Sequence, residues 1–167
     1  MDSIQLTHNQ VKNNKTDKEI IVIACTIRTP ENVGMLFRIS EAFGVQKVIL
    51  IGESPNLSNK KVLRTARSTE KKLNIEFVAE VQEIIMTLQK NKFQLIGLEL
   101  TNKSTRLQEF DFKTSNKIAI FIGSERFGIS NEILQQLDKT VHVDLFGENS
   151  SVNVVNAVAI ALYEIMR

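Results

Sequence analysis

The sequence predicts an α/β protein with a mostly parallel sheet of five or six strands and helices on both faces. Short runs rich in β-branched residues recur along the chain, and segments with helical spacing of apolar residues lie between them. This alternation is typical of parallel sheets, because two parallel strands need a long crossover connection between them. The expected strands are residues 19–26, 45–51, 74–78, 93–100, 117–122 and 140–145.

The first strand, helix and second strand have clear boundaries. Strand 19–26 is followed by Thr29 as helix cap and by Pro30, which suits the first helical position because its φ angle is already helical and its missing N–H is not needed there. The helix is expected at 31–43. Gly44 ends it, since glycine readily takes the left-handed conformation that follows many helices.

The C-terminal part of the chain contains two strands that each lead into a polar loop and then a helix, the first helix opening at Ser130. The loops are residues 123–128 and 147–153, and an earlier amphipathic helix is expected at 81–89. Because the carboxyl ends of parallel strands meet at one edge of a sheet, we expect the two loops to lie together. Open α/β sheets bind their ligands at that edge.

Both loops carry more polar groups than packing requires. Gly123 and Gly128 permit tight turns and let a ligand approach main-chain N–H groups, and Glu125 lies between them. The same pattern also occurs in ordinary strand-to-helix turns, so a purely structural role stays open. In the second loop, residues 149–153 supply more polar side chains than a single helix cap needs.

Composition indicates an ordinary globular protein. With 167 residues, of which 43% are hydrophobic and 24% charged, the chain is expected to form one domain with a sizeable core. The net charge of +2 excludes a protein that coats nucleic acid through overall charge, but it allows a local basic patch. Residues 1–18 are expected to be a flexible polar arm that precedes a single domain at 19–167.

The cysteine and histidine content argues against disulfide and metal chemistry. Cys25 is the only cysteine, so no internal disulfide can form, and a reducing cytoplasmic location is expected. Its apolar neighbours favour a buried residue over a nucleophile. His8 and His142 lack the spacing of metal ligands, and no apolar run approaches the roughly 20 residues that cross a membrane. Neither a metal nor a membrane partner is expected.

The helix at 31–43 holds a charge where apolar residues dominate. Arg38 lies within the apolar run 35–39, and a buried arginine needs an anionic or hydrogen-bonding partner. Gly34 in the same helix costs roughly 1 kcal/mol relative to alanine, which indicates the close approach of another group. Arg38 is therefore either a surface residue, free or paired with Glu41, or an arginine held at a functional site.

A second group of cations follows the second strand. Lys60, Arg64, Arg67 and Lys71 recur at intervals of four, three and four residues, which places them on one face if the segment is a single helix. We call these four residues the basic stripe. Such a stripe is either a solvated helix face or a surface that contacts phosphates.

Three segments taken together resemble one protein family. Residues 32–38 are Asn-Val-Gly-Met-Leu-Phe-Arg, residues 123–128 are Gly-Ser-Glu-Arg-Phe-Gly, and residues 151–154 are Ser-Val-Asn-Val. In this order they are similar to the Asn-x-Gly-x-x-x-Arg, Gly-x-Glu-x-x-Gly and Ser-Leu-Asn-Val motifs of the SpoU (TrmH-like) family of RNA ribose 2′-O-methyltransferases, within the SPOUT superfamily. Val152 replaces the usual leucine. The resemblance covers about residues 19–167.

The resemblance implies a fold and a cofactor that the residue patterns do not. It implies a deep trefoil knot in the C-terminal part, with S-adenosylmethionine bound in a bent form, largely by main-chain groups of three loops. On this chain the implied cofactor-binding residues are Leu98, Glu99, Gly123, Val143 and Val152. It also implies a homodimer whose active site is completed across the interface, with the apolar faces of helices 31–43 and 153–166 as candidates for that interface.

The resemblance further implies roles for the polar motif residues. Arg38 would contact the ribose 2′-hydroxyl and an adjacent phosphate, either as a general base or by stabilising the developing alkoxide; the second role is easier, since arginine stays charged. Asn32 would fix the first motif or Arg38, and Glu125 would anchor either of these two. Ser151 and Asn153 would orient the substrate or the cofactor loop. The basic stripe would contact the RNA backbone.

The expected function is S-adenosylmethionine-dependent methylation of an RNA 2′-hydroxyl. The compact form and the sequence of residues 28–32 favour the tRNA guanosine branch, while ribosomal RNA stays an alternative. A non-catalytic RNA-binding module on the same scaffold is a further alternative. A nicotinamide-dependent oxidoreductase is disfavoured, because no Gly-x-Gly-x-x-Gly turn follows the first strand.

Overall fold

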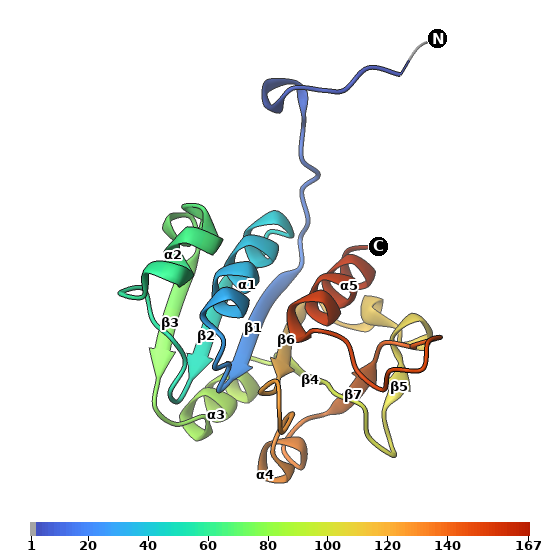
Figure 1. The fold of residues 1–167 in the computed structure, drawn as a ribbon. Helices are drawn as coiled ribbons and strands as arrows, with labels where there is room; N and C mark the ends of the chain where they lie inside the picture. The colour runs from blue at the N-terminus through green and yellow to red at the C-terminus, as the bar shows by residue number, and fades with distance from the viewer. Residues whose placement is uncertain (1–2) are drawn as a thin grey trace.

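The computed structural model describes residues 3–167 and shows one parallel sheet with helices on both faces (Figure 1). Among the described residues the sheet has seven strands in the order β3-β2-β1-β6-β4-β7-β5, and the pairings between them are parallel. The strands are β1 Glu19–Cys25, β2 Lys47–Ile51, β3 Asn74–Val78, β4 Gln94–Leu98, β5 Thr105–Arg106, β6 Lys117–Ile122 and β7 Lys139–His142.

The prediction of five or six strands is wrong because it omits β5. This strand has only two residues, Thr105 and Arg106, which pair with Val141 and His142 of β7. Two residues are too few to show the alternation by which a strand is recognised, so the sequence indicated only a polar loop there. The expected strand at 140–145 is also shorter, since β7 ends at His142 and the chain continues as a loop.

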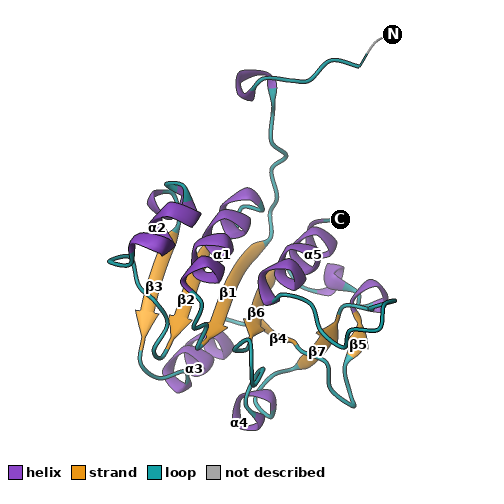
Figure 2. Ribbon diagram, in the orientation of Figure 1, coloured by secondary structure: helices purple, strands orange, loops and turns teal. Residues whose placement is uncertain are grey.

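Helices connect the strands and cover the sheet (Figure 2). The α-helices are α1 Pro30–Ala42, α2 Lys60–Ala66, α3 Gln82–Lys90, α4 Asn131–Leu134 and α5 Val154–Met166, and the short 3₁₀ helices are η1 His8–Gln10, η2 Thr69–Lys71, η3 Leu107–Glu109 and η4 Phe112–Thr114. The segment before β1 extends away from the sheet in both views. Of the arm expected at 1–18, residues 1–2 lie outside the described residues.

The sheet separates two layers of core, as β1 illustrates. Ile20, Val22 and Ala24 join the cluster beneath α1, α2 and α5, whereas Ile21 and Ile23 join the cluster beneath α3 and α4. Successive residues of a strand point to opposite faces, so a strand that is covered on both sides is apolar throughout. This condition explains the apolar runs from which the sheet was predictable.

The boundaries of α1 agree with the sequence. Pro30 occupies the first helical position, and Gly44 follows the helix with φ +65°. Thr29 holds the N-cap position, but its side chain makes no capping hydrogen bond. Thr29 is therefore the cap residue that the sequence predicted, although its hydroxyl takes no part and its backbone N–H bonds to another loop.

The basic stripe does not form one continuous helix face. α2 ends at Ala66, and the next two residues, Arg67 and Ser68, take left-handed conformations with φ 53° and 69°. The Arg67 N–H bonds back to the Leu63 carbonyl, which terminates the helix. Lys60 and Arg64 thus lie on α2, while Arg67 lies in the turn after it and Lys71 in η2. All four residues of the stripe are exposed.

The strand order identifies the edge where a ligand site is expected. From β1 the chain builds β2 and β3 outward on one side, and the later strands lie on the other side, with β6 directly beside β1. The loops that leave the carboxyl ends of β1 and β6 therefore meet where the direction of winding reverses. Doubly wound sheets bind their ligands at this switch point.

Gly34 allows α1 and α2 to pack closely. A Cβ atom at this position would lie 2.5 Å from the Val62 carbonyl oxygen and 2.7 Å from the Thr65 Cβ. Carbon atoms do not approach other heavy atoms this closely, so only glycine fits. The close approach that the sequence indicated is therefore a contact with α2 and not with a ligand.

Replacing Gly34 with alanine is expected to lower the free energy of unfolding by about 1–3 kcal/mol, because the added methyl group forces α2 away from α1. Urea unfolding followed by circular dichroism measures this change. Gly147→Ala is the matched control, since nothing lies within 4 Å of its Cβ position. The control is expected to change stability by less than about 0.5 kcal/mol. Equal effects of the two substitutions would contradict the packing argument.

Candidate functional site

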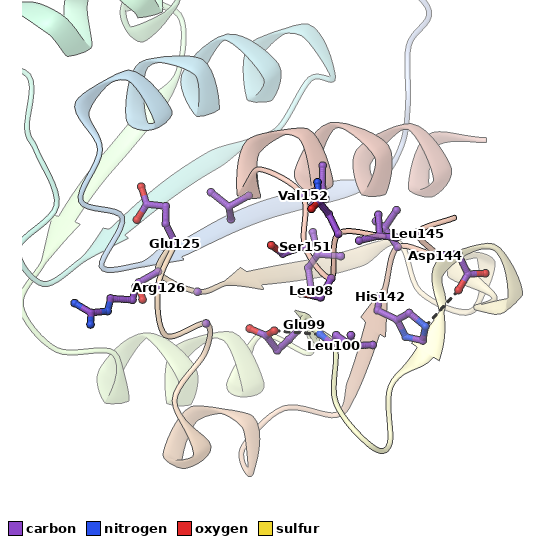
Figure 3. A pocket seen from close by; sticks show the side chains of 18 of the residues that line it. Leu98, Glu99, Leu100, Glu125, Arg126, His142, Asp144, Leu145, Ser151 and Val152 are labelled. Carbon is purple, nitrogen blue, oxygen red and sulfur yellow. Dashed lines mark hydrogen bonds and ion pairs between the residues drawn. The ribbon is translucent and has the colours of Figure 1, made fainter. Parts of the chain in front are cut away.

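A cavity of about 770 Å³ opens at the carboxyl ends of β4, β6 and β7 (Figure 3). Its walls are residues 98–100, 123–128, 142–145 and 147–152, together with Val154 and Ala157 of α5. The five residues expected to bind a cofactor all line it: Leu98, Glu99, Gly123, Val143 and Val152. The structure thus brings together residues that the sequence placed on three separate loops.

The loop at 123–128 is a tight turn that depends on its two glycines. Ser124 and Gly128 form a short antiparallel bridge, with backbone hydrogen bonds of 3.1 and 3.0 Å, and Ser124 Oγ accepts a bond from the Phe127 N–H at 3.1 Å. A Cβ at Gly123 would overlap the backbone of Gly128. Gly128 itself has φ +63°. Only glycine satisfies both positions, so the turn depends on Gly123 and Gly128.

Glu99 fastens this loop to the end of β4. One of its carboxylate oxygens accepts a hydrogen bond from the Ile129 N–H at 2.9 Å, and the other accepts one from the Leu100 N–H at 3.1 Å. A Cβ at Gly128 would overlap the same carboxylate. Glu99 therefore braces two walls of the cavity against each other.

Glu125 joins the same loop to the start of α1. Its carboxylate accepts hydrogen bonds from the Arg28 N–H at 3.2 Å, the Thr29 N–H at 3.1 Å and the Asn32 Nδ2 at 2.9 Å. The N-terminal end of a helix carries partial positive charge and free N–H groups, so a carboxylate is stabilised there. Glu125 thus occupies the anion position at the N-terminus of α1.

These contacts lower the pKa of Glu125. Partial burial of the carboxylate on its own raises the pKa, but the hydrogen bonds from Asn32 and from the backbone outweigh it and lower the value from 4.5 to about 2. Glu125 is therefore ionised at neutral pH, and it acts as a hydrogen-bond acceptor and not as a proton donor.

A line of side-chain amides extends from Glu125 to α5. Asn153 Nδ2 donates to Asn32 Oδ1 at 3.0 Å, and Asn153 Oδ1 accepts from the Val155 N–H at 2.9 Å. An ionised carboxylate can only accept and a backbone N–H can only donate, so both ends fix which way the two amides face. We call Glu125, Asn32 and Asn153 the amide relay. It joins all three sequence motifs.

The other expected catalytic residues lie in different places. Ser151 is exposed and lines the cavity (Figure 3). Arg38 is half-buried on α1 and is not among the cavity-lining residues. The side chains in the described part of the chain give Arg38 no ion pair, and Glu41 pairs instead with Lys72 at 3.3 Å. The alternative of an Arg38–Glu41 pair is therefore wrong for this structure. The basic stripe also lies outside the cavity.

Sequence reasoning missed a polar cluster around Asp144 at one wall of the cavity. Its carboxylate accepts from Gln108 Nε2 at 2.7 Å and lies 3.5 Å from both Arg106 Nε and His142 Nε2. Arg106 and His142 face each other across the β5–β7 pairing. The cluster holds the start of the loop that follows β7. Its members come from two distant segments, so no local sequence signal pointed to it.

Cys25 lies in the apolar core. Cys25 is buried, and burial raises the pKa of its thiol to about 12, so the thiol is not activated as a nucleophile. Residues 3–167 contain no group of three or more potential ligands placed to hold a metal ion. In the same part of the chain, every helix is too short or too polar to cross a membrane.

The low pKa of Glu125 predicts a pH dependence of stability. Because the pKa is lower in the folded protein than the ordinary value of 4.5, the ionised carboxylate stabilises the folded state above about pH 5. This stabilisation is lost as the pH falls from about 4.5 to about 2. The difference in unfolding free energy between the wild type and Glu125→Gln should therefore shrink over that range. Urea unfolding at a series of pH values measures it.

Glu132→Gln is the matched control, since Glu132 is an exposed residue of α4 whose carboxylate accepts no hydrogen bond from the described residues. It is expected to give a much smaller and nearly constant difference. A wild-type advantage over Glu125→Gln that did not change with pH would contradict the assigned hydrogen bonds.

Two curated relatives are similar to almost the whole chain. The tRNA (guanosine(18)-2′-O)-methyltransferase of Saccharomyces cerevisiae is 28% identical over 166 residues, which cover 96% of this chain and 11% of the yeast protein. The 23S rRNA (guanosine-2′-O-)-methyltransferase RlmB of Acinetobacter baylyi is 26% identical, covering 94% of this chain and 62% of that protein. The chain therefore spans less than two thirds of the length of either relative.

A solved structure shares the fold. The SpoU methyltransferase AviRb from Streptomyces viridochromogenes, in complex with the cofactor AdoMet, superimposes with a TM-score of 0.81 at 22% identity. The match covers 96% of this chain and 60% of the AviRb chain. At this identity the likeness concerns the fold alone.

The family assignment rests on a match to most of the chain. The model of the SpoU rRNA Methylase family matches residues 19–163, which include all three motifs, the amide relay and the cavity. The match begins at the first residue of β1 and ends within α5. This protein belongs to the SpoU methylase family.

Proposed function

We propose that this protein is an S-adenosylmethionine-dependent RNA 2′-O-ribose methyltransferase. The observation that carries the proposal is the amide relay, which ties residues of all three motifs together beside one cavity. Curated relatives whose names describe RNA 2′-O-methyltransferases support the reaction type. We also propose that residues 19–167 form one methyltransferase domain, that the described residues before it, 3–18, are a flexible arm and that the protein is cytoplasmic.

The cavity suits S-adenosylmethionine in size and in lining. A volume of about 770 Å³ is within the range of small-molecule sites. Leu98, Val143 and Val152 offer apolar surface to a planar base, while Gly123 leaves the backbone accessible. Glu99 would act by bracing the walls. The AdoMet complex of AviRb, a protein with the same fold, supports this choice. We further propose that the surrounding loops form a trefoil knot.

A ribose 2′-hydroxyl is a poor nucleophile, so the protein must assist its reaction with the methyl group. The bound cofactor would supply an electrophilic methyl group, and the protein must orient a ribose 2′-hydroxyl in line with it while the hydroxyl loses its proton. A permanently charged guanidinium is suited to stabilise the developing alkoxide. We assign this role to Arg38, with Ser151 orienting the substrate. Asn32, Glu125 and Asn153 would position the first and third motifs.

Arg38 would act in a homodimer. It does not line the cavity of its own chain, but it is a partly exposed residue of α1, which packs beside α5. On α5, Ile160 and Tyr163 are 44% and 64% exposed, and both are apolar enough to be covered by another subunit. A homodimer through α1 and α5 would bring Arg38 of the partner subunit toward this cavity.

RNA is the proposed partner, and the basic stripe is its proposed contact. Four exposed cations beside α1 suit a phosphate backbone, which is bound by charge and without sequence preference. We favour tRNA, in keeping with the yeast relative, and ribosomal RNA is the second candidate, in keeping with RlmB.

The deciding experiment is the transfer of labelled methyl from S-adenosylmethionine to bulk tRNA and, separately, to ribosomal RNA, followed by nucleoside analysis. We expect a 2′-O-methylated nucleoside from the tRNA pool. Labelling of ribosomal RNA alone would select the second candidate. S-adenosylhomocysteine should raise the melting temperature, because it binds only the folded state, and NAD should not. Failure of both transfer and stabilisation would overturn the methyltransferase assignment.

Arg38→Ala is expected to lower kcat by at least about 100-fold, because it removes the stabilisation of the developing alkoxide. Its affinity for S-adenosylhomocysteine, measured by calorimetry, should stay unchanged, since Arg38 lies outside the cavity lining of its chain. Arg38→Lys keeps the charge and tests whether charge alone suffices. Loss of cofactor affinity in Arg38→Ala would assign the residue a structural role instead.

Joint replacement of Lys60, Arg64 and Arg67 with alanine should weaken RNA binding. The plot of the logarithm of the binding constant against the logarithm of salt concentration should become less steep by about 2, because fewer counterions are released. Fluorescence anisotropy with labelled tRNA at several salt concentrations measures the slope. Replacing the exposed Lys90, Lys92 and Lys139 removes the same charge elsewhere. An effect of equal size in this control would contradict a specific role of the stripe.

A further inference from the structure

The tip of the loop at 123–128 presents two side chains that the amide relay does not use. Three residues lie between the bridged Ser124 and Gly128, and the first, Glu125, bonds to α1. The other two, Arg126 and Phe127, are exposed. Figure 3 shows Glu125 and Arg126 leaving the same turn in different directions. At the tip, Glu125 therefore stabilises the fold, whereas Arg126 and Phe127 are exposed.

Phe127 is unusually exposed for an aromatic residue on a rigid loop. Its side chain is 71% exposed, and the Arg126 guanidinium lies 5.1 Å from the centre of its ring. Isolated exposed apolar residues are common, so exposure alone carries no argument. Here, however, the ring stands on a turn fixed by two glycines and the Ser124–Gly128 bridge, and the same residues line the cavity. The bridge holds the backbone beneath the ring, and Phe127 belongs to neither core cluster.

Other apolar side chains share the rim of the cavity. Leu100 is 63% exposed and Leu145 is 40% exposed, and both line the cavity together with Phe127. The rim thus offers apolar surface with one cation beside it. A nucleobase combines a flat apolar face with a nearby phosphate, and aromatic rings and arginines are the side chains on which unpaired bases stack.

We propose that Phe127 is a stacking platform for an unpaired nucleobase of the RNA, with Arg126 holding the neighbouring phosphate. This inference rests on the proposed function, and it narrows the substrate class. A base inside a duplex is already stacked on its neighbours and cannot cover the ring, whereas a base in a loop or single strand can. The target ribose then belongs to a single-stranded or loop segment of RNA.

The test compares a fluorescein-labelled single-stranded RNA with a duplex RNA that contains the same strand. Both are titrated with protein saturated with S-adenosylhomocysteine, so that binding is measured without methyl transfer. Removal of the aromatic face in Phe127→Leu should weaken binding of the single strand roughly 5- to 150-fold, the range for loss of one stacked base. Duplex binding should not change, and Phe127→Trp should restore single-strand binding.

The matched control is Met86→Ala, which removes an exposed apolar side chain, 53% exposed, from α3 outside the cavity lining. It should bind both RNAs as the wild type does. Equal melting temperatures of all variants exclude misfolding. Unchanged single-strand binding in Phe127→Leu overturns the inference. So does an equal fall for both RNAs, or a change of oligomeric state, which would mean that the ring packs against a second copy.

Methyl transfer by the wild type separates this inference from the proposed function. If the wild type methylates an RNA pool but Phe127→Leu shows no rise in KM for that RNA, only the stacking role fails. If the wild type methylates neither tRNA nor ribosomal RNA and S-adenosylhomocysteine does not raise its melting temperature, the proposed function fails, and the inference that rests on it fails as well.

Discussion

The organisation of the site depends on the carboxylate of Glu125 at the N-terminus of α1. This one group accepts hydrogen bonds from two backbone N–H groups and from the side-chain amide of Asn32. Asn32 in turn orients Asn153, which caps α5. Without the negative charge, Asn32 Nδ2 would lose its acceptor, and the bond from the Val155 N–H to Asn153 would still orient the two amides. The turn after β6, the start of α1 and the start of α5 are therefore held together by one ionised carboxylate and two side-chain amides.

The parts of the structure that local physics determines were predictable from the sequence. Burial on both faces requires strands that are apolar throughout, so most strands of the sheet could be predicted from apolar runs in the sequence. Pro30 and Gly44 mark the ends of α1 because each has backbone preferences that suit one end of a helix. The five residues expected at the cofactor all line the cavity, because parallel strands deliver their following loops to one edge.

Most of the parts that depend on distant contacts were not predictable. The two backbone N–H groups that bond to Glu125 lie 96 and 97 residues away in sequence, so these bonds follow only from the fold. The contact with Asn32 was one of the two that the family resemblance implied. Asp144 likewise meets Gln108 across 36 residues. The break in the basic stripe arises because Arg67 and Ser68 adopt left-handed conformations. Neither residue is glycine, so the sequence did not indicate that the helix ends there. The pairing of β5 is set by β7, since two residues cannot specify a strand.

The close packing at Gly34 has a geometric consequence for any polyanion that reaches this face. Because the backbone of α2 lies directly against α1 at this point, the two helices cannot slide past each other without a clash. The cations of α2 and the amide of Asn32 on α1 therefore keep a constant separation. If the basic stripe binds RNA as proposed, the phosphates held on α2 would lie within a limited range of distances from the amide relay. In that arrangement the packed helix pair sets the distance between the bound phosphates and the start of α1.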